Sequence, residues 1–194
     1  LGFRYRNGPV SLEAFAFRNE IHDGIGIQAT GDTVQGLPEY QNVNVDRLRY
    51  LGIEASGSAV LGAGFSTRAD LTVFDSKDVR DPSNPVAQSY GLRVGGQLRY
   101  DHSSGRFWLA YALRHNGRQK DVAVLLSPVG SPLPAFTVQE ARVGFRLFRT
   151  GRTEHSVVWV IRNLGNTLYS EASNSNFFRP APGRSVVVSY RMDF

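Results

Sequence analysis

Apolar and polar side chains alternate with a period of two along most of the chain. Between residues 140 and 147, for example, one face carries only apolar side chains, and the other carries glutamate, arginine and glycine. This period is that of a β-strand with one apolar and one polar face. No segment combines a 3.6-residue period with helix caps, so we predict an all-β fold. Nine strands are predicted, at residues 1–6, 9–21, 42–60, 64–75, 88–101, 106–116, 136–149, 153–163 and 184–194.

The connections between these strands alternate in length. Four are tight turns that each contain a glycine, at residues 7–9, 61–64, 102–105 and 150–152. The other four are long, at residues 28–40, 76–88, 117–135 and 164–183. Short turns at one end and long loops at the other are typical of outer-membrane barrels, and strands of about 10–14 residues fit a tilted membrane crossing. We therefore predict an antiparallel transmembrane β-barrel.

The two faces of each strand would then meet different surroundings. Strands cross hydrocarbon only as a closed barrel, because every backbone N–H and C=O must be paired there. Apolar faces would point to lipid and polar faces to the lumen, which accounts for a hydrophobic content of only 41% beside clear apolar stripes. On the polar faces Glu54, Asp70, Glu140 and Asp193 accompany the arginines that we expect to face the lumen, which are Arg68, Arg93, Arg99, Arg142, Arg146 and Arg191.

Charge and reactive residues argue against several function classes. The net charge of +5 comes almost wholly from arginines spread singly along the strands, so we expect no nucleic-acid partner. The chain has no cysteine, and its four histidines lie on separate segments without metal-ligand spacing. No catalytic constellation can be assembled from the sequence. We expect neither an enzyme, nor a cofactor, nor a bound metal.

Particular motifs resemble a known family. The segment from Arg162 to Tyr169 reads RNLGNTLY, a PGR motif follows at residues 182–184, and an alternating strand ends on Phe194. Together they are similar to the C-terminal end of a TonB-dependent outer-membrane receptor. Upstream, Gly52 and Glu54 stand as the GxE of a mid-barrel hairpin in such receptors.

This resemblance implies an architecture and an activity. The chain would be the C-terminal part of the barrel, the last nine strands of about 22. The plug domain, the first strands and the segment that contacts TonB would lie outside it. The resemblance implies a multi-pass protein of the Gram-negative outer membrane that imports a scarce ligand, a ferric siderophore or similar iron chelate, with energy from the TonB complex.

The resemblance also assigns roles to individual residues. The terminal strand, with Phe194, Tyr190 and Met192 on its apolar face, would be the signal read by the barrel-assembly machinery. Membrane lipid and lipopolysaccharide would surround the barrel. Loop residues expected to contact the ligand are Tyr40, Tyr169, Phe177, Phe178 and Arg179. The arginines of the polar faces would either attract an anionic ligand or form ion pairs with the plug.

Two other readings of the sequence stay open. A passive, porin-like channel would be a barrel without a plug or TonB contact. A soluble β-sandwich that binds a ligand would also contain alternating strands, although it would not sort its loops by length.

Overall fold

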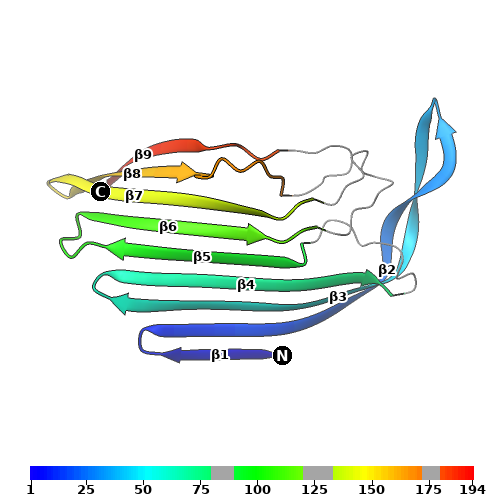
Figure 1. Ribbon diagram of the computed structural model, residues 1–194, viewed down its shortest axis with the longest axis horizontal. Helices are drawn as coiled ribbons and strands as arrows, with labels where there is room; N and C mark the ends of the chain where they lie inside the picture. Colours follow the sequence, from blue (N-terminus) through cyan, green and yellow to red (C-terminus); the bar gives the residue numbers. More distant parts are fainter. Residues whose placement is uncertain (80–89, 120–132, 172–179) are drawn as a thin grey trace.

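The computed structural model describes residues 1–79, 90–119, 133–171 and 180–194. Nine strands form one antiparallel sheet, in which each strand pairs with its neighbours in the sequence (Figure 1). No helix in these ranges is long and apolar enough to cross a membrane. The strands are β1 (Gly2–Asn7), β2 (Val10–Val34), β3 (Leu37–Gly62), β4 (Phe65–Asp78), β5 (Leu92–Asp101), β6 (Phe107–Asn116), β7 (Phe136–Thr150), β8 (Thr153–Arg162) and β9 (Ser185–Asp193).

The predicted all-β antiparallel fold is confirmed. The described residues form one sheet rather than two packed sheets, so the soluble sandwich reading is wrong. The edges of the sheet are β1 and β9, and the sheet is a partial barrel wall that does not close on itself. An exposed strand edge is a template for further pairing, as barrel closure requires.

The four short turns lie at the same end of the sheet, together with the C-terminus (Figure 1). They join β1 to β2, β3 to β4, β5 to β6 and β7 to β8. Gly8, Gly64 and Gly151 have φ angles of 51°, 84° and 61° in three of these turns, a backbone conformation that favours glycine. The pattern of short connections read from the sequence therefore corresponds to one rim, which we call the short-turn rim.

The predicted long loop at residues 28–40 is wrong. Strand β2 continues to Val34 and β3 begins at Leu37, and the two strands pair as far as these residues. Gln35 and Gly36 form a two-residue turn with φ angles of 53° and 79°, the left-handed geometry that suits a hairpin. Polar and glycine-rich composition concealed the strands. The resulting hairpin projects beyond the end of the sheet that is opposite the short-turn rim (Figure 1).

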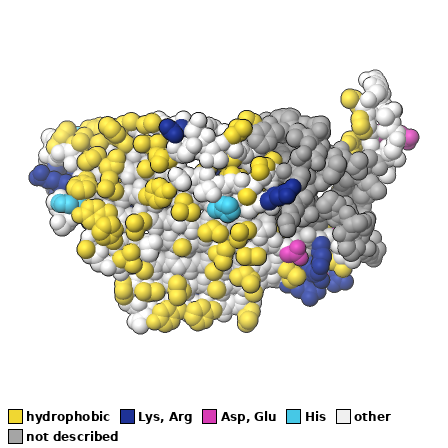
Figure 2. All heavy atoms as spheres, in the orientation of Figure 1, with side chains coloured by type: hydrophobic (Ala, Val, Ile, Leu, Met, Phe, Trp, Pro, Cys, Tyr) yellow, Lys and Arg dark blue, Asp and Glu magenta, His cyan; other side chains and the backbone are white. Residues whose placement is uncertain are grey.

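One face of the sheet is apolar and exposed. Cross-strand pairing places Leu109, Val143, Trp159 and Val188 in one row across β6 to β9. The exposed fractions of Leu109 and Trp159 are 46% and 52%, although a water-soluble fold would bury such side chains. Figure 2 shows hydrophobic side chains over most of this face. The alternation in the sequence thus produces the continuous apolar surface expected of a barrel wall in lipid.

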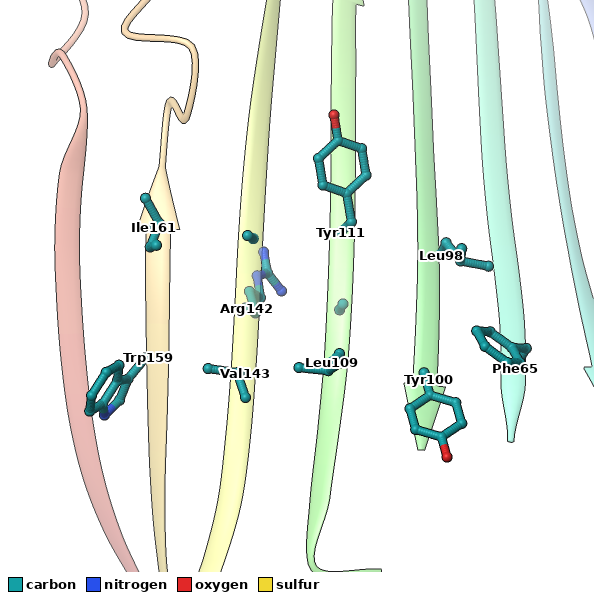
Figure 3. Close-up of a pocket in the computed structure, with 11 residues that line it drawn as sticks. Phe65, Leu98, Tyr100, Leu109, Tyr111, Arg142, Val143, Trp159 and Ile161 are labelled. Carbon is teal, nitrogen blue, oxygen red and sulfur yellow. The ribbon is translucent and has the colours of Figure 1, made fainter. Parts of the chain in front are cut away.

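A hollow of about 470 Å³ lies on this apolar face, lined by side chains of β4 to β8. Figure 3 shows Tyr111, Val143 and Trp159 on the near side of the strands. The side chain of Arg142 lies on the far side of β7, because neighbouring residues of a strand point to opposite faces. Since lipid would fill this hollow, the polar face is the better place to look for a ligand site.

Candidate functional site

The polar face carries all six arginines that the sequence predicted to share it. Pairing across the sheet aligns Arg99 on β5 with Ala110 on β6 and Arg142 on β7. Arg146 on β7 aligns with Ser156 on β8 and Arg191 on β9. Arg68 and Arg93 lie on the same face, since they align with Gln97 and Asn116. That this face lines the lumen of a complete barrel stays a prediction.

Four of these arginines form ion pairs with acids of the wall itself. Three pairs have N–O distances of 2.6 to 2.8 Å, namely Arg99 with Asp101, Arg146 with Glu154 and Arg191 with Asp193. Arg142 pairs with Glu140. The paired acids lie two residues away on the same strand or on a neighbouring strand. These arginines are therefore neutralised by acids of the wall itself, which was not predicted from the sequence.

A polar hollow of about 460 Å³ lies on this face between β6 and β9. Glu140 on β7 is its only lining carboxylate among the described residues, and it pairs with Arg142. The Nε of Arg162 on β8 lies 3.6 Å from the same carboxylate. Two guanidinium groups therefore share one carboxylate, which leaves the hollow with an excess of positive charge and with donors available to an anion.

An aromatic and cationic cluster borders the hollow at the end away from the short-turn rim. The ring centroid of Phe136 lies 6.0 Å from that of Tyr90 and 4.6 Å from that of Tyr169. The guanidinium of Arg114 lies 5.8 Å from the Phe136 ring centroid and pairs with Glu171. Arg114 and Tyr169 also line the hollow, so the cluster and the hollow form one continuous site.

Tyr90 is held in place by its hydroxyl. This hydroxyl donates a hydrogen bond of 2.7 Å to the carbonyl oxygen of Ser170. Burial raises the pKa of the Tyr90 hydroxyl, and the nearby Glu171 carboxylate raises it further. The hydroxyl therefore stays protonated at neutral pH and continues to donate. Through this bond the segment before β5 is tied to the segment after β8.

Asn163 fixes the backbone that carries Tyr169. Its amide nitrogen donates to the carbonyl oxygens of Thr167 and Pro182, at 2.9 and 3.2 Å. Its amide oxygen accepts from the backbone N–H of Thr167 at 2.9 Å. Asn163 is 6% exposed and has a φ angle of 48°, a left-handed conformation that asparagine tolerates well. The asparagine of the RNLGNTLY motif is thus a positioning residue for one side of the site.

The other residues predicted to contact ligand are not brought to this cluster by the described structure. Tyr40 lies on the projecting hairpin, where its backbone pairs with Ala29. Phe177, Phe178 and Arg179 lie outside the described residues. Tyr169 alone of the five belongs to the site, and its role in binding stays a prediction.

The terminal residues lie on the apolar face at the short-turn rim. Phe194 is 93% exposed, and Tyr190 and Met192 are about half exposed. Tyr190 contacts His155 of β8 through its hydroxyl. That the assembly machinery recognises these three residues stays a prediction.

The sequence did not predict most members of the site, namely Tyr90, Arg114, Phe136, Arg162 and Glu171. A signal was present for two of them. The alternation that places Glu140 and Arg142 on the polar face also places Phe136 there, and that of β6 does the same for Arg114. Other aromatics, such as Phe17, Phe74 and Trp108, also lie on the polar face, so the alternation placed Phe136 and Arg114 there without singling out a site. Within the described ranges, no three His, Asp or Glu side chains gather in a way that could hold a metal ion.

Comparison with known proteins places the chain in a family. The family model described as "TonB dependent receptor-like, beta-barrel" matches residues 1–174. The chain belongs to this family of TonB-dependent receptor β-barrels. The membership confirms the predicted family and the predicted location in the Gram-negative outer membrane. No curated protein matches the chain.

Solved structures share the fold at low sequence identity. The copper transporter OprC is 19% identical, with a TM-score of 0.80 over 96% of this chain and 30% of its own. BauA, the ferric preacinetobactin receptor of Acinetobacter baumannii, is 15% identical, with a TM-score of 0.75 over 100% of this chain and 28% of its own. The ferric enterobactin receptor PfeA of Pseudomonas aeruginosa is 16% identical, with a TM-score of 0.74 over 97% of this chain and 29% of its own. The chain thus spans less than a third of the length of these proteins.

Proposed function

We propose that the chain forms part of the barrel wall of a receptor that imports an anionic metal chelate, a ferric siderophore or similar iron chelate. Energy comes from the TonB complex, through a plug and a contacting segment that lie outside this chain. The family membership supports the receptor class, and relatives of the same fold include proteins named for ferric chelates and for copper.

The polar hollow is the observation that carries the proposed ligand class. Arg142 and Arg162 share the single carboxylate of Glu140, so the site retains positive charge. Charge-assisted hydrogen bonds from guanidinium groups to anionic oxygens are among the stronger polar contacts available to a protein. The rings of Phe136 and Tyr169 beside the hollow offer flat surfaces against which aromatic groups of a chelate pack.

The test uses the full-length receptor that contains this chain. We expect Arg162→Gln to weaken binding of the ferric chelate about tenfold, the effect of losing roughly 1.4 kcal/mol of charge-assisted contact. Arg152→Gln, in the exposed turn between β7 and β8, removes the same charge at the short-turn rim and serves as the matched control. A panel of radiolabelled ferric catecholates and hydroxamates, together with copper, supplies the ligands.

Two readouts separate the parts of the proposal. The amount of ligand bound per folded barrel tests the role of the hollow in binding, and heat-modifiable gel mobility reports the folded fraction. Equal affinity of Arg162→Gln and Arg152→Gln would contradict that role. Uptake by cells with and without a proton gradient tests active transport. Uptake that persists without the gradient would favour the porin-like channel instead.

A further inference from the structure

Arg114 lines the polar hollow, but its guanidinium is already paired with an acid. The partner is the carboxylate of Glu171, which lies 57 positions further along the chain, in the segment that follows β8. Glu171 is not among the described residues that line the hollow. Arg142 and Arg162, in contrast, share Glu140, which belongs to the wall strand β7. A carboxylate from outside the strands therefore takes up donors of Arg114 that an anionic ligand would use.

The backbone beside Glu171 is held in place. The hydroxyl of Tyr90 donates a hydrogen bond of 2.7 Å to the carbonyl oxygen of Ser170, and Ser170 is only 3% exposed. The ring of Tyr169 packs against that of Phe136, with centroids 4.6 Å apart. These contacts keep the Glu171 carboxylate close to its guanidinium partner, at a high effective concentration.

The ion pair itself is open to water. The side chains of Arg114 and Glu171 are 35% and 55% exposed. An ion pair this exposed contributes little to stability, and salt screens it. The Glu171 side chain can therefore rotate away while Ser170 stays bonded to Tyr90. Arg114 keeps its own support when that happens, because its guanidinium lies 5.8 Å from the ring centroid of Phe136.

A buried polar side chain beside Phe136 is left unpaired in this arrangement. Asn116 aligns with Phe136 on the neighbouring strand and is fully buried. In the part of the chain that the structure describes, neither its amide nitrogen nor its amide oxygen has a hydrogen-bond partner. A buried donor and a buried acceptor without partners are costly. A rearrangement that brought water or a polar ligand group to Asn116 would recover this cost, so opening the site is favoured more than its printed contacts suggest.

We propose that Glu171 is an internal competitor, which an anionic group of the imported chelate displaces from Arg114. Displacement exchanges one charge-assisted contact for another, so it favours ligands with several negative charges over singly charged ions. The tethered carboxylate thereby keeps small monoanions such as acetate off Arg114. The inference rests on the proposed import of an anionic chelate, and it adds a residue that determines which anions the site accepts.

The experiment measures the affinity of the purified full-length receptor for two probes, a trianionic ferric tris-catecholate and a neutral ferric tris-hydroxamate. Acetate serves as a competing monoanion. The variants are Glu171→Gln, Arg114→Gln and the combination of both, with folding checked by heat-modifiable gel mobility. Glu54→Gln is the matched control. Glu54 lies on the same polar face but on β3, where it aligns with Phe15 and Thr72, so the change removes an equal charge away from Arg114.

We expect Glu171→Gln to bind the tris-catecholate about fivefold more tightly than the wild type, the factor to which an exposed ion pair amounts. Acetate should inhibit this binding at a lower concentration than in the wild type. Arg114→Gln should bind the tris-catecholate more weakly, and adding Glu171→Gln to it should have no further effect. Affinity for the neutral tris-hydroxamate should not change. Glu54→Gln should alter tris-catecholate affinity by less than about twofold, because salt screens distant charges.

Unchanged or weaker tris-catecholate binding by folded Glu171→Gln would overturn the inference. An equal gain in the Arg114→Gln background, or in Glu54→Gln, would also overturn it, since the gain would then reflect overall charge. Arg162→Gln separates this failure from that of the proposed function. Weaker tris-catecholate binding by Arg162→Gln without a gain in Glu171→Gln contradicts the internal competitor alone. A wild type that binds neither chelate contradicts both.

Discussion

The ring of Phe17 on β2 covers the backbone of Gly52 on β3, its cross-strand partner. A Cβ added at residue 52 would collide with this ring and would lie 2.9 Å from the carbonyl oxygen of Val73. Phe17 in turn packs against Phe74 of β4, with ring centroids 6.2 Å apart. The glycine of the GxE motif is therefore the place where an aromatic side chain lies flat on the wall.

This contact predicts a selective effect of alanine. We expect Gly52→Ala to destabilise the barrel by about 1–3 kcal/mol, because the ring must leave its rotamer. Gly96→Ala is the matched control, since its nearest neighbour, a Leu113 side-chain carbon, would lie 3.9 Å from the new Cβ. Reversible unfolding of the full-length receptor in lipid gives both free energies. Equal stability of the two variants would show that the ring moves aside without cost.

The assignment of the two faces predicts the effect of a new charge. We expect Leu109→Arg to cost about 2 kcal/mol, because Leu109 lies within the apolar surface and its new charge would meet lipid. Ala112→Arg should be far milder, since Ala112 lies on the polar face opposite Glu140. The same unfolding measurement compares them. A larger loss for Ala112→Arg than for Leu109→Arg would mean that the faces are reversed.

Whether a feature of this wall could be predicted from the sequence depends on how far apart in the chain the interacting residues lie. The alternation of Val143 with Arg142, and turns such as that at Gly151, depend on residues close together in the chain, so strands and short turns were predictable. The outer part of the β2–β3 hairpin, which turns at Gln35, was not predicted because glycines and polar residues hid its alternation. Its turn was the available signal, a Gln-Gly pair flanked by the apolar residues Val34 and Leu37.

The candidate site was harder to predict, because its members come from distant segments. Tyr90 and Ser170 are joined by a hydrogen bond across 80 positions of the chain. Nothing near either residue in the sequence indicates that bond. Arg162 was visible as a polar residue, but its sharing of Glu140 with Arg142 depends on the register of β7 and β8.

The three hydrogen bonds of Asn163 predict a local effect on the loop side of the site. Asn163→Gly preserves the left-handed backbone but removes all three bonds, at a cost of about 1–3 kcal/mol. Hydrogen exchange at residues 163–171 should become faster, while exchange at residues 153–161 of β8 stays unchanged. Asn163→Asp retains the acceptor for the backbone N–H of Thr167. Its exchange rates at residues 163–171 should therefore lie between those of the wild type and those of Asn163→Gly. Unchanged exchange in Asn163→Gly would show that other contacts hold the loop.

The exposed end of β9 predicts an effect on assembly. Deleting Phe194 should lower the amount of folded receptor in the outer membrane, while each folded molecule binds ligand normally. Phe194→Tyr keeps an aromatic end and should assemble as the wild type does. Heat-modifiable gel mobility reports folding, and ligand bound per folded barrel reports function. Normal assembly with lost uptake would instead assign the terminus a role in transport.

The membrane topology of the wall can be tested most directly by labelling single cysteines on intact cells. The chain has no cysteine of its own, so Val34→Cys near the tip of the hairpin and Arg152→Cys in a short turn each give one reporter in this part of the receptor. With a membrane-impermeant maleimide, we expect the cysteine at residue 34 to be labelled on intact cells. The cysteine at residue 152 should be labelled only after the outer membrane is permeabilised. Labelling of residue 152 on intact cells, or protection of residue 34, would contradict the account of this sheet as a barrel wall with its short-turn rim in the periplasm.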